Sequence, residues 1–300
     1  MTVASPRLSP ADRIERQRRR RWTLLSLPTT VFLVVALVVP IVVTVGYSLV
    51  SFVSAGVFGD EFTLENYLAV LTDSFFLQIF GRTLLLGFAV VVLTLLLGFP
   101  LASMLVNGRG IVPAVLTVVI LMPLMTSVVV RSYAWRIIFS DTGFFMTSLN
   151  SFLSGLGIPK LSLQFSYTGA AIAMAHVLLP LMVFALAGAL RQIDPDIAQA
   201  ARTLGASRTR TFFDTTLPLA APGIFAGCVL VFVLTISAFP TPQLVGGAQT
   251  QVAATLIYSR ATTALNWPLS STLSIVLVLI VFLLMYLNGI WTNRMRKEAK

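Results

Sequence analysis

Six apolar stretches in the chain are each about as long as the path across a membrane, and none has a charged residue at its centre. A helix crosses the hydrocarbon core, about 30 Å thick, in about 20 residues. Soluble domains carry about 25% charged residues, and at 11% this 300-residue chain cannot cover a water-exposed surface. The stretches therefore predict membrane-spanning helices, at Pro28–Val50, Thr83–Val106, Val112–Val130, Gly169–Leu190, Gly223–Phe239 and Ser270–Trp291.

The charges that flank these stretches predict their orientation, because Lys and Arg gather on the cytoplasmic side of membrane spans. With the amino end in the cytoplasm, sixteen basic residues fall inside. The five outside are Arg82, Arg131, Arg136, Lys160 and Arg260. The predicted fold class is an all-α integral membrane protein with about six transmembrane helices and both termini cytoplasmic.

This order predicts the domain organisation. It comprises a basic cytoplasmic tail at 1–27, a first helix at 28–50, an external loop at 51–82, a five-helix core at 83–291 that includes a cytoplasmic loop at 191–222, and a cytoplasmic tail at 292–300. The first stretch exceeds the 7–15 apolar residues of a signal peptide. It is therefore expected to stay uncleaved, with Val53-Ser54-Ala55 as the alternative cleavage site. The semi-apolar segment Val252–Leu265 predicts an interfacial helix or a re-entrant turn.

The residue inventory excludes several function classes. The net charge of +10 is explained by membrane orientation and does not require a nucleic-acid partner. With one histidine and one cysteine, no catalytic constellation and no metal site is predicted. No GxxxxGK[ST] phosphate loop occurs, so the chain is not expected to hydrolyse ATP. Spans without central charges disfavour proton pumps and ion-coupled carriers, which leaves a stand-alone secondary carrier or channel as a weaker alternative to a subunit powered by another protein.

The loop between the fourth and fifth stretches carries the signals of a short capped helix. Asp194 suits the N-cap, where a carboxylate accepts free backbone N–H groups, and Pro195 suits the first helical position. Gly205 suits the left-handed residue that ends a helix. The apolar face between them is rich in alanine and too narrow for deep membrane anchoring. The helix is expected either to dock into a groove of a cytoplasmic partner or to lie beneath its own bundle.

The same segment resembles the EAA loop of binding-protein-dependent ABC importer permeases. That loop reads Glu-Ala-Ala, three residues, Gly, nine residues, Ile, any residue and Leu-Pro, and the spacing matches here throughout. Gln199 replaces the glutamate, keeping its length and hydrogen-bonding capacity without its charge, and Thr215 replaces the isoleucine. Together with the N-terminal pair, the positions that the resemblance implies for coupling to an ATPase are Asp194, Pro195, Gln199, Ala200, Ala201, Gly205, Leu217 and Pro218.

The resemblance reaches from about Leu64 to the end of the chain. The run from Leu124 to Trp135 is similar to the third span of permeases from spermidine/putrescine-type importers. The early span and basic amino end are similar to the first permease of those systems. The resemblance implies the ABC importer permease (MetI-like) fold, a location in the bacterial inner membrane and a polyamine substrate. Related branches carry iron, thiosulfate or phosphonate-type solutes.

The resemblance also implies partners. A second permease subunit completes a heterodimer, two ATPase subunits bind below, one under each EAA loop, and an extracytoplasmic binding protein delivers the solute. ATP and Mg²⁺ are expected on the ATPase subunits, so no cofactor is expected in this chain. Membrane lipid surrounds the spans.

Polar residues near helix breakers mark candidate positions along a solute pathway. They are Thr126, Ser127, Tyr133, Trp135, His176 and Ser237. The ordinary alternatives are hydroxyls bonded to their own helix backbone, a buried hydrogen-bonded histidine, and aromatic residues of the membrane interface. A polyamine requires carboxylates or aromatic faces. Because no span has a central carboxylate, the acidic groups are expected from the partner permease, from loop residues such as Asp141, or from the binding protein.

Overall fold

The computed structural model describes residues 10–298, except the side chains of residues 10–25, 195, 198, 202, 208, 287–288 and 290–298. The predicted tails at 1–27 and 292–300 thus fall partly outside the described residues. The amino-terminal half contains α1 (Pro10–Ser48), β1 (Val50–Ser54), β2 (Val57–Phe62), α2 (Glu65–Thr72), α3 (Ser74–Asn107), α4 (Val112–Leu121), the 3₁₀ turn η1 (Met122–Met125), α5 (Val128–Ile138) and α6 (Phe144–Gly155).

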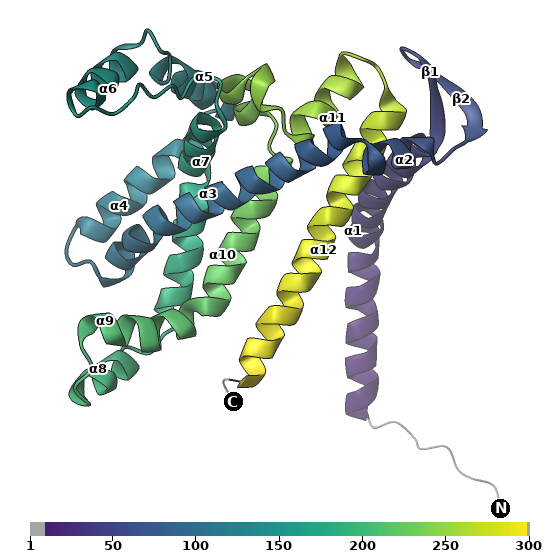
Figure 1. Ribbon diagram of the computed structural model, residues 1–300. Coiled ribbons are helices and arrows are strands. Elements are labelled where there is room, and N and C mark those ends of the chain that lie inside the picture. Colours follow the sequence, from purple (N-terminus) through teal and green to yellow (C-terminus); the bar gives the residue numbers. More distant parts are fainter. Residues whose placement is uncertain (1–9, 299–300) are drawn as a thin grey trace, which may run out of the picture.

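The carboxyl-terminal half continues the helical pattern, with two π-helical turns. It contains α7 (Tyr167–Arg191), α8 (Pro195–Thr203), α9 (Arg208–Thr211), the π turn η2 (Phe212–Thr216), α10 (Leu217–Ser237), the π turn η3 (Pro242–Gly246), the 3₁₀ turn η4 (Ala248–Thr250), α11 (Ala253–Thr262) and α12 (Trp267–Glu298). Long helices cross the molecule between two ends, as Figure 1 shows. One end carries α8, α9 and the outer ends of α1 and α12; the other carries the hairpin, α2, α5, α6 and α11.

Five described helices are long and apolar enough to cross a membrane, and a bent pair makes a sixth if it counts as one span. This agrees with the prediction of about six transmembrane helices. The helix bounds differ at particular caps. α3 begins nine residues before the predicted Thr83, because the Asp73 carboxylate accepts the Phe75 N–H at 2.8 Å and caps it. α10 begins at Leu217 and ends at Ser237, before the predicted Phe239.

The third predicted span, Val112–Val130, is divided in the structure. Its two parts, Val112–Met125 and Val128–Ile138, meet at 98°. Pro123 supplies no backbone N–H, and Thr126 and Ser127 have extended backbones that leave the helix. The Arg131 side chain, 7% exposed, donates from Nη1 to the Pro123 carbonyl, which also accepts the Thr126 N–H at 3.3 Å.

The buried core lies among α3, α7 and α10. Its fully buried members include Val90, Met182 and Val231. Glycines allow the helices to approach closely: a Cβ on Gly223 of α10 would overlap that of Ala189 on α7, and one on Gly227 would lie 3.0 Å from that of Ala185. Small residues at such spacing are typical of helix pairs in membranes. The α7–α10 pair is therefore packed backbone against backbone at the end nearest α8.

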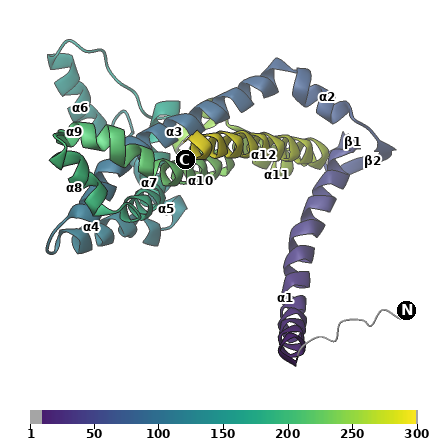
Figure 2. The same ribbon diagram turned by 90° about the horizontal axis from the view of Figure 1, so that it is seen from below.

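The segment between α1 and α2, predicted as an external loop, contains a two-stranded antiparallel hairpin, which the all-α prediction did not include. Three aromatic rings secure it to the helices: Tyr47 lies 5.4 Å from both Phe58 and Trp267, measured between ring centres. The Ser48 carbonyl accepts a 3.3 Å hydrogen bond from Thr272. α1 packs against α12, and Figure 2 shows α1 standing away from α3, α7 and α10. Its apolar span, Ser26–Ser48, is otherwise uncovered.

Candidate functional site

The helix α8 forms in the loop between α7 and α10, where the sequence predicts it. The Asp194 carboxylate accepts the Asp196 N–H at 2.9 Å, which is the N-cap bond. Gly205 has φ +88°, and the Ala206 N–H donates to the Ala201 carbonyl at 3.1 Å. This six-to-one bond beside a left-handed residue is the Schellman arrangement. α8 is thus capped at both ends. The side chain of Pro195 is not among those that the structure describes.

The face of α8 that the sequence marks as apolar is uncovered within the described chain. Ile197 is 43% exposed and Leu204 is 89% exposed. Gln199 and Ala200 are also exposed, and Ala201 is half-buried. Uncovered apolar residues on a short projecting helix are typical of a contact surface for another protein. Of the two predicted placements, docking to a partner fits this exposure, and burial beneath the bundle does not.

Removing the Asp194 carboxylate tests whether the cap holds α8. In Asp194→Ala, we expect α8 to lose about 1 kcal/mol of local stability, which corresponds to roughly fivefold faster amide exchange across residues 196–203. Asp194→Asn is the matched control, because an asparagine caps as well as an aspartate. Hydrogen–deuterium exchange measures both variants. Equal exchange in the wild type and Asp194→Ala would show that the cap does not stabilise α8.

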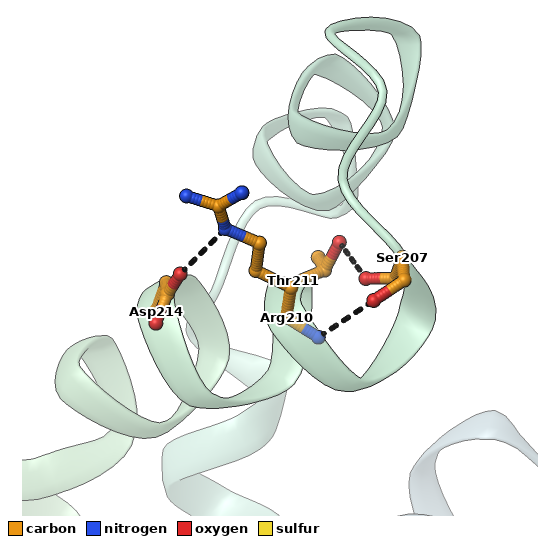
Figure 3. A network of polar contacts seen from close by, with 4 residues as sticks. All are labelled: Ser207, Arg210, Thr211 and Asp214. Atoms are coloured by element: carbon orange, nitrogen blue, oxygen red, sulfur yellow. Dashed lines mark hydrogen bonds and ion pairs between the residues drawn. The ribbon is translucent and has the colours of Figure 1, made fainter.

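A polar network orders the segment between α8 and the membrane helix α10, as Figure 3 shows. The Ser207 hydroxyl accepts the Arg210 N–H at 3.2 Å, and its carbonyl accepts the Thr211 hydroxyl at 3.0 Å. Arg210 Nε lies 3.2 Å from a carboxylate oxygen of Asp214. Both charged side chains are exposed, so this ion pair stabilises little by itself. The network shapes the short α9 and leads into the π turn η2.

Two contacts connect this segment with the core. The Phe212 ring, in η2, lies 5.1 Å from the Phe99 ring of α3 at an edge-to-face angle of 83°. Leu217 and Pro218 stand in the first turn of α10, whose Gly223 then meets Ala189 of α7. The segment that follows α8 therefore contacts α3 through aromatic rings and is continuous with the close packing of α10 on α7.

Beside these contacts lies a cavity of about 550 Å³ between α7, α8 and α10. Asp194 and Ile197 line it from the α8 side, and Gly188 and Gly223 line it from the long helices. The cavity leaves room for α8 to move relative to the helix pair. It contains one carboxylate, that of Asp194, which already caps α8.

The structure brings together two of the six predicted pathway residues through a direct contact. Trp135 of α5 donates from Nε1 to His176 Nδ1 on α7 at 3.2 Å. The bond requires Nδ1 without a hydrogen, so the neutral imidazole carries it on Nε2. Among the other four, Tyr133 is exposed on α5, Ser237 bonds the Val233 carbonyl of its own helix, and Thr126 and Ser127 lie in the break before α5.

The sequence reasoning missed the connection between α8 and the core. A serine that precedes a short helix is a recognised N-cap signal, so Ser207 was detectable. The π turn and the pairing of Phe212 with Phe99 have no local sequence signal, because they depend on how distant helices meet. Within the described residues, no group of three or more His, Cys, Asp or Glu side chains is placed to hold a metal ion.

Comparisons with known proteins agree on the class of this fold. The family described as "Binding-protein-dependent transport system inner membrane component" matches residues 17–297. The spermidine/putrescine transport system permease protein PotB of Escherichia coli (strain K12) is 30% identical over 256 residues, which cover 85% of this chain and 91% of that protein. The ferric transport system permease protein FbpB 1 of Haemophilus influenzae is 26% identical over 248 residues, which cover 81% of this chain and 38% of that protein.

Solved structures show a similar fold. A chain in the crystal structure of a bacterial alginate ABC transporter, in complex with its alginate pentasaccharide-bound periplasmic protein, matches with a TM-score of 0.71 at 17% identity, over 94% of this chain and 98% of that one. A chain of the MetNI methionine ABC transporter in an inward-facing conformation matches with a TM-score of 0.55 at 14% identity, over 75% of this chain and 99% of that one. At these identities the likeness concerns the fold.

Proposed function

We propose, from the membership of this chain in the family of binding-protein-dependent transport system inner membrane components, that it forms half of the solute pathway of an ATP-driven ABC importer. The driving force for transport comes from a separate ATPase. Its family consists of transport permease subunits, which are not enzymes. The observation that carries the coupling proposal is α8, a helix capped at both ends whose apolar residues are uncovered.

The proposed mechanism is mechanical. ATP binding closes the two ATPase subunits, and each pulls the EAA-type helix that it holds. In this chain Gln199, Ala200 and Ala201 face the ATPase, and the small side chains of the two alanines allow close approach. The Phe212–Phe99 and Gly223–Ala189 contacts pass the movement to α3 and α7. The pathway then changes from inward-open to outward-open.

The proposed assembly contains a second permease subunit, two ATPase subunits and an extracytoplasmic solute-binding protein. ATP and Mg²⁺ bind to the ATPase subunits. The chain lies in the bacterial inner membrane with both termini in the cytoplasm. α8 lies at the same end of the molecule as the outer ends of α1 and α12, and this supports the orientation.

The proposed substrate is a polyamine such as spermidine or putrescine. PotB, at 30% identity over most of both chains, supports this choice. The Trp135 indole and the exposed Tyr133 ring on α5 offer aromatic faces to a cation. The second candidate is iron, because FbpB 1 also matches most of this chain.

Labelling from each side of the membrane tests the orientation. In a Cys228→Ser background, Leu204→Cys places a single thiol on α8, and Phe144→Cys, at a side chain 90% exposed, places one on α6 at the opposite end. We expect a membrane-impermeant maleimide to label Leu204→Cys in inside-out vesicles and Phe144→Cys in intact cells. The reverse pattern would overturn both the topology and the coupling proposal.

Uptake measurements test the substrate. Proteoliposomes that contain the chain with its second permease, ATPase and binding protein are expected to accumulate radiolabelled spermidine when ATP is enclosed on the ATPase side. Unlabelled putrescine is expected to compete, and ferric iron is not. Uptake of iron without uptake of polyamine would replace the polyamine assignment and leave the permease function intact.

A further inference from the structure

A groove between α3 and α7 combines apolar walls with one cation. It has a volume of about 650 Å³, and its apolar lining on α3 includes Leu85, Phe88 and Val92. Arg82 lines it at one end. From Arg82 to Leu93 the lining extends about 16 Å along α3, at 1.5 Å per residue. Leu85 and Phe88 are more than 60% exposed, so this wall is open in the chain alone.

The guanidinium group of Arg82 lies over an aromatic ring, and within the described part of the chain its N–H donors have no hydrogen-bond partner. Its central carbon lies 5.9 Å from the centre of the Tyr167 ring. Stacking uses the face of the planar guanidinium and leaves its N–H edge available. The Tyr167 hydroxyl is itself fixed by a 3.3 Å bond to the Gln251 carbonyl. Among the described residues, no carboxylate pairs with Arg82.

Arg82 lies in the third turn of α3, and charged residues gather at the ends of membrane spans, which places this cation near one membrane interface. The helix has 34 residues and is therefore about 51 Å long, whereas about 20 residues cross the hydrocarbon core. Arg82 stands about 38 Å along the axis from Asn107, at the other end of the helix. The groove thus begins at the membrane interface and runs toward the centre of the bilayer, with its apolar part inside.

We propose that this groove binds an anionic phospholipid, whose phosphate contacts Arg82 and whose acyl chain lies along α3. The charge of Arg82 complements the phosphate, and the order from interface to centre is the same in the groove and in the lipid. This site is separate from the coupling helix, and it does not depend on which solute the transporter carries.

Native mass spectrometry of the full chain, purified with the subunits that accompany it, tests the site. Phosphatidylglycerol and the zwitterionic phosphatidylethanolamine are added in parallel. Arg82→Gln is expected to lower phosphatidylglycerol binding about fivefold, since one basic residue at a membrane surface contributes about that factor, with phosphatidylethanolamine binding unchanged. Arg136→Gln is the matched control, because Arg136 also stacks on a ring, that of Phe165, at 5.3 Å, and does not line the groove.

Two results would overturn the proposal. The first is equal phosphatidylglycerol binding by the wild type and Arg82→Gln. The second combines two observations: the wild type binds no phosphatidylglycerol, and Arg82→Gln copurifies less of the second permease subunit than the wild type does. That result would assign the groove to a helix of the partner protein. Val92→Trp tests the apolar part of the groove separately. The larger side chain should fill that part and lower the binding of both lipids, although Arg82 is still present.

Discussion

Gly205→Val is expected to lower solute-stimulated ATP hydrolysis by the assembled transporter about tenfold, because the left-handed backbone that closes α8 is strained for any residue with a Cβ and most for a β-branched one. Gly205 has φ +88°, and its Cβ position is open, so the effect comes from the backbone and not from a clash. A valine would pull the end of α8 out of the Schellman arrangement and move Leu204, which ends the exposed face.

The matched control is Gly110→Val. Gly110 has φ +63° and an equally open Cβ position, and it lies in the turn between α3 and α4, outside α8. Both variants carry the same kind of local strain, so a general loss of stability would affect them alike. Gly205→Asn should recover part of the activity, since asparagine tolerates the left-handed region. If Gly205→Val and Gly110→Val have the same activity and copurify the same amount of ATPase, the closed end of α8 does not take part in coupling.

Gly223→Ala is expected to destabilise the chain by about 1–3 kcal/mol, the usual penalty for adding a methylene to a packed interior. A Cβ on Gly223 would overlap the Cβ of Ala189, so α7 and α10 must separate. The separation would also disturb the path from α8 to the core. Thermal unfolding of the purified complex should show a lower midpoint for this variant.

Gly188→Ala gives the opposite expectation on the partner helix. Gly188 lies on α7, one residue before Ala189, and its Cβ position meets no atom within 4 Å. There an alanine adds helix propensity, about 0.8–1.0 kcal/mol in favour of folding. The unfolding midpoint should therefore stay the same or rise. Equal midpoints for Gly188→Ala and Gly223→Ala would contradict the close contact between α7 and α10.

The parts of the fold that sequence reasoning recovered depend on local signals. Asp194 and Gly205 define the ends of α8 because capping needs only a few neighbouring residues. The apolar stretches gave the number of spans because their length is set by the bilayer. The ABC importer permease fold that the resemblance implied is confirmed by the family match and the similar structures.

The parts that sequence reasoning missed depend on contacts between distant segments. Pro123 was visible as a helix breaker, but the 98° bend and the contact of Arg131 with the Pro123 carbonyl depend on how the two parts pack. The hairpin at Val50–Phe62 is held by Trp267, more than 200 residues away in the chain. Trp135 was assigned to the pathway, and its bond to His176 forms when α5 lies against α7.

The position of α1 has a consequence for biogenesis. This helix packs mainly against α12, and the hydrogen bond from Thr272 to Ser48 joins residues 224 positions apart. During synthesis the first helix therefore enters the bilayer long before the helix that packs along it has left the ribosome. Until α12 is made, α1 keeps the contacts near its Ser48 end, such as that of Tyr47 with Phe58, and a nascent chain cut short before Trp267 would lack the helix that covers the rest of its length.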